Sequence, residues 1–479
     1  MKNNIILTNL FWRFTERFGS QLVTFIVSLI IARLIDPSVY GVVALLMILI
    51  NILQVFIDGG LGNSLIQKKD ADDLDFSTVF FFNIFASIIL YIGVFYFAPF
   101  LAKFYSISEL TILIRVLSIS LIISGIANIQ LAYVSKKLIF KKFFFSTLVG
   151  IIFGAILGIL LAYKGFGIWA LIVQYLTNVT INTVVLWIII DWRPKLYFSF
   201  ERFKGLFSYG WKILVSSLID VIYNDTRQLI IGKVYSTRDL AFYNRGKHFP
   251  YLIIFNINKS IDSVLFPVMA DIQNNMHKLK KITQVSVRVS SYIMWPMMIG
   301  LFTISESLVE LLLTEKWLPS VPYLKIFCLI YAFYPIHTAN LNALKAIGRS
   351  DVFLKLEIIK KIIGIISIII TMKMGVFQMA IGMLITTILC TFINAYPNSK
   401  LLNYHFTEQI KDFLPNMILS IMMGLSIYPL KFIISNLVIL IVCQILCGIG
   451  TYYLYSRLFG IYPIEKLKKG LTEKLDKIR

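Results

Sequence analysis

Residues 143–163 read FFFSTLVGIIFGAILGILLAY, and this run contains no charged side chain. A helix rises 1.5 Å per residue, so a run of this length can cross the hydrocarbon core of a bilayer, which is about 30 Å thick. Residues 432–456, FIISNLVILIVCQILCGIGTYYLYS, are uncharged in the same way. Runs of this kind predict helices that span a membrane.

The composition of the whole chain agrees with this class. Of its 479 residues 58% are hydrophobic, and the mean hydropathy is +0.79. Such values exclude an ordinary soluble protein and favour a polytopic membrane protein. The chain has 46 Lys and Arg against 25 Asp and Glu, a net charge of +21. We interpret this excess as loop charges that set the orientation in the membrane, not as a nucleic-acid surface.

Apolar segments long enough to span a bilayer recur along the chain and predict an all-α polytopic membrane protein with about fourteen transmembrane helices. The expected spans are 10–34, 41–66, 76–100, 111–134, 143–163, 166–190, 209–232, 241–269, 284–304, 322–346, 356–372, 374–397, 412–430 and 434–457. The loops on one side of these spans hold 23 Lys and Arg, and those on the other side hold 7. The positive-inside rule therefore predicts that both termini are cytoplasmic.

Two pairs of segments indicate an internal repeat. LIIARLIDPSVYG (29–41) aligns with LIIGKVYSTRDLA (229–241), and ANIQLAYVSKKLIF (127–140) resembles ANLNALKAIGRSDV (339–352). An even number of spans separates the copies, so we expect two bundles in parallel, pseudo-twofold relation around a central cavity. The expected parts are a six-helix bundle at 1–190, a second at 191–397, helices 13 and 14 at 398–458, and a basic cytoplasmic tail at 459–479.

Polar residues inside the expected spans are the candidate functional residues, because a charge at the bilayer centre costs about 2.5–3.5 kcal/mol on insertion scales. In LIDVIYNDTRQLII (218–231), helical geometry places Asp220, Asn224 and Arg227 on one face. They either line the cavity, with Asp220 as a possible coupling carboxylate, or pair with each other to hold helices together.

The first span carries a matching stripe. Arg13, Glu16 and Arg17 share a face with Ser20 and Thr24, and the offset of 200 residues between the repeats aligns the last two with polar positions of 218–231. The stripe therefore also favours a shared cavity. The alternative is that both arginines extend to the cytoplasmic interface, with the glutamate as a local partner.

Two further places carry intramembrane polar groups. Arg245, Asn256 and Lys259 share one face of the span at 241–269. Asp58 precedes a glycine pair, and it either caps the helix after that break or binds a coupling cation. Cationic residues in a cavity suit an anionic substrate, since Arg and Lys both bind phosphate.

Several functions are excluded by missing motifs. The sequence has no Walker loop, which argues against ATP as the energy source, and its histidines and cysteines show no metal-binding spacing. We therefore expect no cofactor, no metal site and no enzymatic activity.

Longer motifs resemble a known family. GGLGNSLIQKKD followed by DFSTVFFFNIFAS (59–87), GFGIWALIVQYLTN (165–178) with DWRP (191–194), and the region 206–275 with its FP and IQNN elements are similar to polysaccharide transporters. The family is the polysaccharide (Wzx-type) flippase group of the multidrug/oligosaccharidyl-lipid/polysaccharide exporter superfamily, particularly its lipopolysaccharide and teichuronic-acid export branch.

The resemblance implies a flippase that moves an oligosaccharide on undecaprenyl pyrophosphate across the bacterial cytoplasmic membrane by alternating access, for O-antigen, capsule or exopolysaccharide synthesis. It implies that Arg13, Arg17 and Lys259 bind the pyrophosphate and that Glu16 or Asp220 couples transport to H⁺ or Na⁺. It also implies contact with membrane lipids and, as partners, a polysaccharide polymerase and a chain-length protein.

Two alternatives remain. A multidrug/cation antiporter of the same superfamily usually has twelve spans and an acidic cavity, which the fourteen expected spans and the Arg and Lys residues disfavour. A membrane polysaccharide polymerase or glycosyltransferase needs a large outward loop, and the expected outward loops are short.

Overall fold

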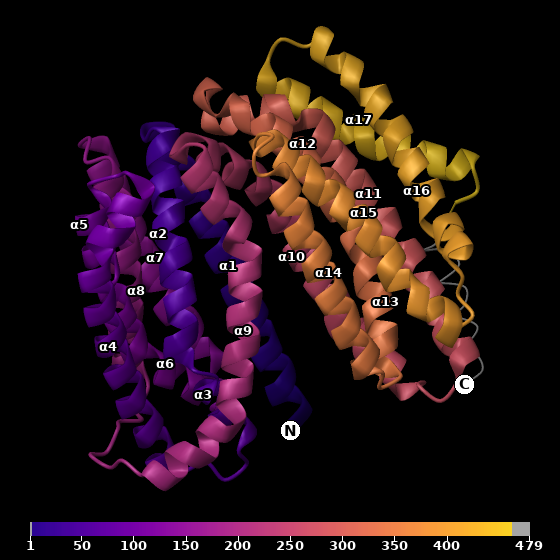
Figure 1. The fold of residues 1–479 in the computed structure, drawn as a ribbon. Helices are drawn as coiled ribbons and strands as arrows, with labels where there is room; N and C mark the ends of the chain where they lie inside the picture. The colour runs from indigo at the N-terminus through magenta and orange to yellow at the C-terminus, as the bar shows by residue number, and fades with distance from the viewer. Residues whose placement is uncertain (1, 462–479) are drawn as a thin grey trace. The chain divides into compact units, whose positions relative to one another are not determined.

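The computed structural model describes residues 2–461, except the side chains of 2–11, 13, 14, 16, 17 and 263. Its helices (Figure 1) are α1 (Lys2–Leu34), α2 (Pro37–Asp58), α3 (Leu61–Gln67), α4 (Asp73–Tyr105), α5 (Leu110–Leu117), α6 (Ile119–Lys137), α7 (Phe140–Tyr163), α8 (Ile168–Ile189), α9 (Phe200–Val234), α10 (Thr237–Asp271), α11 (Met276–Leu313), α12 (Val321–Ala332), α13 (Tyr334–Ala346), α14 (Ser350–Thr371), α15 (Val376–Leu401), α16 (Phe406–Ile427) and α17 (Leu437–Leu458). Short 3-10 turns, η1 (Glu315–Ser320) and η2 (Tyr428–Phe432), precede α12 and follow α16.

The predicted class, an all-α membrane protein, is confirmed. Within the described residues, twelve helical segments are long and apolar enough to cross a membrane. Two expected spans are not among them. In α1 the apolar part, Phe18–Leu34, is short, and α14 carries Lys355, Glu357, Lys360 and Lys361. The count of fourteen therefore stays a prediction.

Three expected spans are not single helices. The segment 41–66 breaks at Gly59 and Gly60, which adopt φ +52° and +67°. The segment 111–134 divides at Ser118, between α5 and α6. The segment 322–346 divides at Phe333, and Pro335 lies in the first turn of α13, where its missing N–H is tolerated. Apolar length predicts a span but does not predict such interruptions.

The chain forms two compact units, Met1–Ala241 and Phe242–Arg479, called unit 1 and unit 2 below. In unit 1, α9 packs against α2, α3 and α4. The domain boundaries expected from the repeat, at 190/191 and 397/398, stay predictions.

The run quoted at the outset becomes α7, which packs closely along α8 and α1. A stripe of small residues makes the approach possible: Ser146, Gly150, Gly154, Gly158 and Ala162 are all buried. A Cβ atom at Gly154 would lie 2.7 Å from the carbonyl oxygen of Gln174 on α8. Helices in membranes associate through such small-residue faces, because apolar burial alone does not drive their association in lipid.

In unit 2, a polar network joins α16 to α11, α13 and α15. Arg288 Nε lies 2.6 Å from Asp412 Oδ1, and the Tyr404 hydroxyl donates to Asp412 Oδ2 at 2.7 Å. Asn340 Nδ2 donates to Gln409 Oε1 at 2.9 Å, and Asn398 Nδ2 donates to Asn340 Oδ1 at 2.7 Å. We call these six residues the α16 joint.

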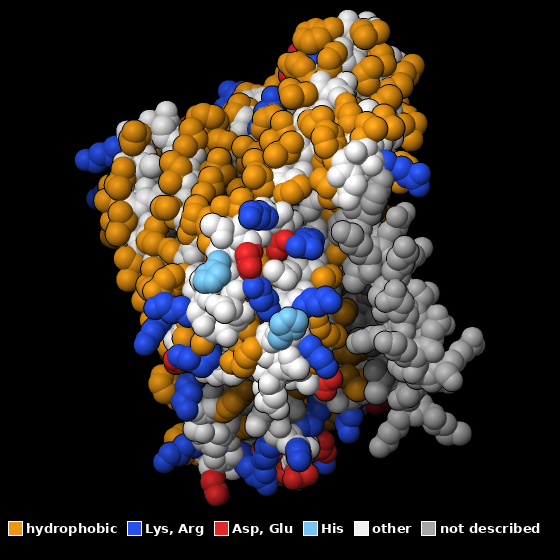
Figure 2. All heavy atoms as spheres, turned by 90° about the vertical axis from the view of Figure 1, so that its right-hand side faces the viewer, with side chains coloured by type: hydrophobic (Ala, Val, Ile, Leu, Met, Phe, Trp, Pro, Cys, Tyr) orange, Lys and Arg blue, Asp and Glu red, His pale blue; other side chains and the backbone are white. Residues whose placement is uncertain are grey.

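Outside the packed faces, the helices carry apolar side chains. On α17, Val438, Ile439, Val442, Leu446 and Ile449 are all about half exposed or more. Figure 2 shows one face of the molecule on which hydrophobic side chains cover the upper part, while Lys and Arg gather in the lower part. An apolar band bordered by basic residues is the surface expected of helices in a bilayer.

Candidate functional site

A polar pocket of about 310 Å³ lies in unit 1, among α2, α3, α4, α6 and α9. Its polar side chains come from all five helices: Asp58, Asn63, Asn83, Asn128, Ser135 and Ser217. No Lys or Arg is among the described residues that line it. Polar groups converging inside a bundle of apolar helices mark a functional site more often than a packing accident.

Asp58 is the acidic group of this pocket, and its side chain is accessible. Its Oδ1 atom accepts hydrogen bonds from Asn128 Nδ2 on α6 and, at 3.4 Å, from Gln54 Nε2 one turn earlier. The N-terminus of α3 has no side-chain capping bond. The sequence predicted that Asp58 either caps the helix after the glycine pair or binds a coupling cation. The structure shows no hydrogen bond of the kind that the capping role requires.

Asn83 of α4 contributes a buried acceptor. The residue is 2% exposed, and its Oδ1 atom has no hydrogen-bond partner among the described residues. An unpartnered buried amide oxygen costs about 1–3 kcal/mol. Asn83 lines the pocket, but its Oδ1 atom is itself buried, so the residue forms part of the wall and not an open acceptor.

The glycine pair positions the pocket. A Cβ atom at Gly60 would lie 2.2 Å from the carbonyl oxygen of Gly210, so α9 approaches the break between α2 and α3 with backbone against backbone. Ser64 of α3 also donates to the carbonyl oxygen of Leu206 at 3.0 Å. These contacts fix one end of the pocket, and Ser217, two turns further along α9, lies in its wall.

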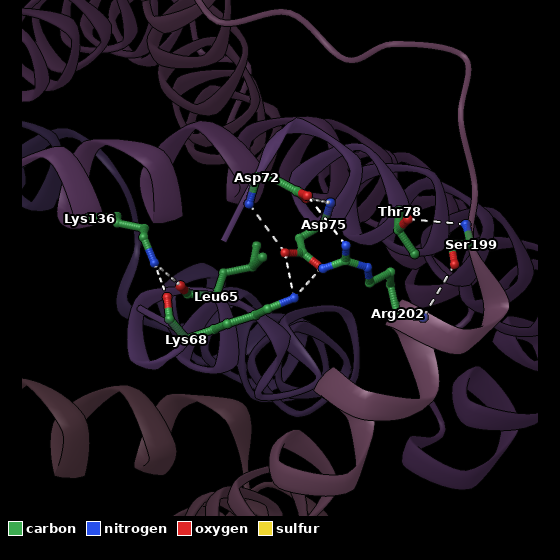
Figure 3. Close-up of polar contacts among 8 residues, drawn as sticks. All are labelled: Leu65, Lys68, Asp72, Asp75, Thr78, Lys136, Ser199 and Arg202. Atoms are coloured by element: carbon green, nitrogen blue, oxygen red, sulfur yellow. Dashed lines mark hydrogen bonds and ion pairs between the residues drawn. The ribbon is translucent and has the colours of Figure 1, made fainter. Parts of the chain in front are cut away.

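Beyond α3, an ion cluster fixes the start of α9 to the start of α4 (Figure 3). Asp75 is fully buried, and its carboxylate lies 2.6 Å from Lys68 Nζ and 3.4 Å from Arg202. Lys136 of α6 donates to the carbonyl oxygens of Leu65 and Lys68. We call Lys68, Asp72, Asp75 and Arg202 the end cluster.

The end cluster also contains the N-cap of α4. Asp72 and Asp75 form a capping box, in which each carboxylate accepts from the backbone N–H of the other residue. The backbone hydrogen bond from Asp75, and the nearby Arg202 guanidinium, lower the pKa of Asp72. Both carboxylates also favour the helix N-terminus, where the backbone dipole is positive.

The linker between α8 and α9 is held to the same end of α4. Lys195 Nζ lies 2.9 Å from Asp73, and the backbone N–H groups of Lys195 and Ser199 donate to the hydroxyls of Ser77 and Thr78. These bonds, with the end cluster, make the linker an ordered part of unit 1.

The candidate residues predicted on α1 are not placed. The side chains of Arg13, Glu16 and Arg17 lie outside the described residues. Their roles in binding pyrophosphate or a coupling cation stay predictions.

The residues predicted on α9 belong to unit 1. Asp220 and Asn224 are exposed, and Arg227 is partly buried. The Nε atom of Arg227 has no hydrogen-bond partner among the described residues. None of the three lines the pocket around Asp58. The predicted residues of α9 and Asp58 therefore do not share one site in the structure.

The residues predicted on α10 fall in unit 2. Arg245 is 7% exposed, with its guanidinium carbon 5.0 Å from the centre of the Trp317 ring. Asn256 donates its amide to the carbonyl oxygen of Leu252 at 2.9 Å. Lys259 is exposed, with its ammonium 5.3 Å from the Phe255 ring. Their placement in a cavity shared with unit 1 stays a prediction.

Sequence reasoning identified Asp58 but missed its neighbours. Asn63, Asn83 and Asn128 are uncharged, and a search for intramembrane charges passes over them. A usable signal was present, because FFFNIF and IANIQL each place an asparagine within an apolar run. Such amides in membrane helices usually hydrogen-bond across helices or line a polar space.

Comparison with known proteins identifies the protein family. Residues 30–322 match the model of the family described as "Polysaccharide biosynthesis protein". Because this match covers more than half of the chain, the chain belongs to that family. The resemblance noted in the sequence is confirmed, and the family is one of transporters, not enzymes.

Individual relatives cover most of the chain. It is 22% identical to the succinoglycan biosynthesis transport protein ExoT of Rhizobium meliloti, over 72% of this chain and 70% of that protein. It is 27% identical to the teichuronic acid biosynthesis protein TuaB of Bacillus subtilis, over 62% of each. It is 23% identical to the lipopolysaccharide biosynthesis protein WzxC of Escherichia coli, over 77% of this chain and 75% of that protein.

Solved structures share the fold. The lipid II flippase MurJ, in an inward closed conformation, matches with a TM-score of 0.77 and 18% identity, over 94% of this chain and 98% of that one. An inward-facing multidrug transporter of the MATE family matches with a TM-score of 0.62 and 14% identity, over 80% of this chain and 94% of that one. The fold is therefore that of a MurJ- and MATE-like transporter.

Proposed function

We propose that the protein moves a polyprenyl-pyrophosphate-linked oligosaccharide from the cytoplasmic to the outer leaflet of the bacterial cytoplasmic membrane. The observation that carries this proposal is the pocket of unit 1, in which six polar side chains from five helices line an open space within an apolar bundle. A glycan crossing a bilayer needs a hydrogen-bonding path, because unpaired polar groups are expensive in hydrocarbon.

The printed names of the relatives support the substrate class. ExoT is a succinoglycan transport protein, TuaB acts in teichuronic acid synthesis and WzxC in lipopolysaccharide synthesis. All three are described by polysaccharide pathways. The fold shared with MurJ and the MATE transporter adds that alternating access is a reasonable mechanism for this chain.

The proposal includes the orientation and the energy source. The excess of basic loops supports fourteen spans with both termini in the cytoplasm. An H⁺ or Na⁺ gradient drives the cycle, with Glu16 or Asp220 as coupling carboxylate. A polysaccharide polymerase and a chain-length protein act on the exported product.

Depletion of the protein in its native cell tests the function. The expected result is accumulation of lipid-linked repeat units that only a cytoplasm-facing probe can reach. Accumulation on the outer leaflet would instead indicate a polymerase, and drug sensitivity without glycan accumulation would indicate a multidrug antiporter. Either outcome would refute the proposal.

A double substitution tests the predicted pyrophosphate site. Arg13→Gln with Arg17→Gln should abolish export while the inserted protein remains at its normal level, because Gln lacks the charge that phosphate requires. Normal export by this variant would assign both arginines to interfacial anchoring.

A further inference from the structure

We propose that the pocket around Asp58 binds an uncharged sugar residue of the cargo, while the pyrophosphate binds elsewhere. The inference rests on the proposed function and assigns one part of the substrate to one site. It follows from three properties of the pocket: its size, its charge and its unused acceptor.

The size fits a single ring and not a whole repeat unit. Ligand pockets usually enclose roughly 300–1,000 Å³, and this pocket, at about 310 Å³, lies at the lower end. It is also too wide for a bare cation, since a closed cation site gathers several oxygens within about 2.5 Å of the ion. A small hydroxylated ring is the ligand that fills such a space and meets polar groups on several sides.

The charge of the pocket disfavours an anion. Asp58 supplies a carboxylate, and its described partners are the uncharged amides of Gln54 and Asn128. No described lining residue is basic. A phosphate or a uronic acid in this space would therefore meet a like charge with no compensating cation, a repulsion of about 1 kcal/mol at 4 Å even in water.

The polar groups match sugar hydroxyls. The second carboxylate oxygen of Asp58, Oδ2, accepts no hydrogen bond recorded for the described residues, and neither does the buried Oδ1 of Asn83. Asp58 is exposed, so its Oδ2 atom can accept from a ligand hydroxyl. Ser217 and Ser135 add hydroxyls that both donate and accept. Ile66, Ile213 and Leu214 supply apolar surface for the C–H face of a ring.

Two probes that differ in one charge test the inference. Methyl β-D-glucopyranoside and methyl β-D-glucuronopyranoside share their ring and differ at C6, where the second carries a carboxylate. Binding of each to the full-length protein in phospholipid nanodiscs is measured by saturation-transfer NMR at low salt. Nanodiscs are required because a maltoside detergent would itself present glucose to the pocket.

The wild-type protein should bind the glucoside about fivefold more tightly than the glucuronoside, the factor expected for one unit repulsion at about 4 Å in water. Asp58→Asn should bring the two probes to similar affinity by strengthening binding of the glucuronoside. Asn83→Leu and Asn128→Leu should each weaken glucoside binding about threefold or more, since each removes a hydrogen-bonding group. Asp191→Asn, a change outside the pocket at a carboxylate that is 96% exposed, should leave both affinities unchanged.

Equal binding of the two probes by wild type and Asp58→Asn protein would overturn the inference. So would glucoside binding that persists in both leucine variants, or ²²Na⁺ binding that depends on Asp58 while neither sugar binds. A variant whose melting temperature falls sharply is replaced by the milder Asn128→Ser. Because binding is measured without transport, its failure leaves the depletion experiment unaffected, and the reverse also holds.

Discussion

The pocket of unit 1 and the α16 joint of unit 2 are built from the same residue types but differ in how their hydrogen bonds are used. In the joint, each amide nitrogen and each charge that we described meets a protein partner, and Tyr404 and Asp412 are 0% and 5% exposed. In the pocket, Asp58 and Asn63 are accessible, and this exposure is the difference, because each region holds one buried amide oxygen without a partner among the described residues, Asn83 Oδ1 in the pocket and Asn398 Oδ1 in the joint. The joint is therefore a structural contact, whereas the pocket is available to a ligand.

The sharpest test of this contrast compares two aspartates. Asp412→Ala should destabilise the protein by about 3 kcal/mol or more, because it leaves Arg288 and the Tyr404 hydroxyl without a partner. Asp58→Ala should cost no more than about 1 kcal/mol, since its accessible carboxylate loses only two amide bonds. Thermal unfolding in nanodiscs measures both, and similar losses would remove the distinction between joint and pocket.

Gly60→Ala should produce the next largest effect, about 2 kcal/mol or more, because the added Cβ meets the Gly210 carbonyl at 2.2 Å and φ is +67°. Gly62→Ala is the matched control, with its Cβ 3.9 Å from the nearest atom and no positive φ. Melting temperature and glycan export are measured together. If the two variants unfold alike, the close approach of α9 to the glycine pair does not position the pocket.

The end cluster offers a smaller contrast. Asp75→Ala should cost about 2–3 kcal/mol, because it removes a buried carboxylate that pairs with Lys68 and is one of the two carboxylates that Arg202 contacts. Asp73→Ala should cost below about 1 kcal/mol, since Asp73 and its partner Lys195 are 52% and 58% exposed. Equal sensitivity of the two variants in thermal unfolding would mean that burial does not govern this end of α4.

Asp220→Asn should have the smallest effect on stability, within about 0.5 kcal/mol, because Asp220 is exposed on α9. Its effect on export, measured across imposed H⁺ and Na⁺ gradients, then reports coupling alone. A large fall in protein level would indicate that Asp220 is a structural residue.

The fold was largely predictable because hydropathy is a local property. Every expected span overlaps a helix, and the uncharged run at 143–163 begins and ends within a few residues of α7. The interruptions were not predictable from apolar length. In the sequence, Gly59 and Gly60 lie within a longer apolar segment that was expected to form one span. The break is explained by the structure, in which the backbone of α9, some 150 residues later in the chain, packs against Gly60.

Only the charged residue of the candidate site could be predicted from the sequence. Asp58 could be identified in the sequence as a charge within an apolar segment. Asn83 and Asn128 could be identified only from the structure, in which α4 and α6 place them in the same pocket as Asp58. The α16 joint was missed for the same reason, since its partners lie up to 124 residues apart, as Arg288 and Asp412 do. Contacts of this range depend on tertiary packing, which periodicity does not encode.

The α16 joint also bears on how the protein can be shortened. Removing α16 and α17 would leave a shorter chain that ends with α15. Asn340 would then lose its bond to Gln409, while the bonds from Asn340 to Ile336 and from Asn398 to Asn340 would remain. Truncation would therefore uncover a polar pair that α16 now buries, and a truncated form should be more stable with apolar residues at both positions.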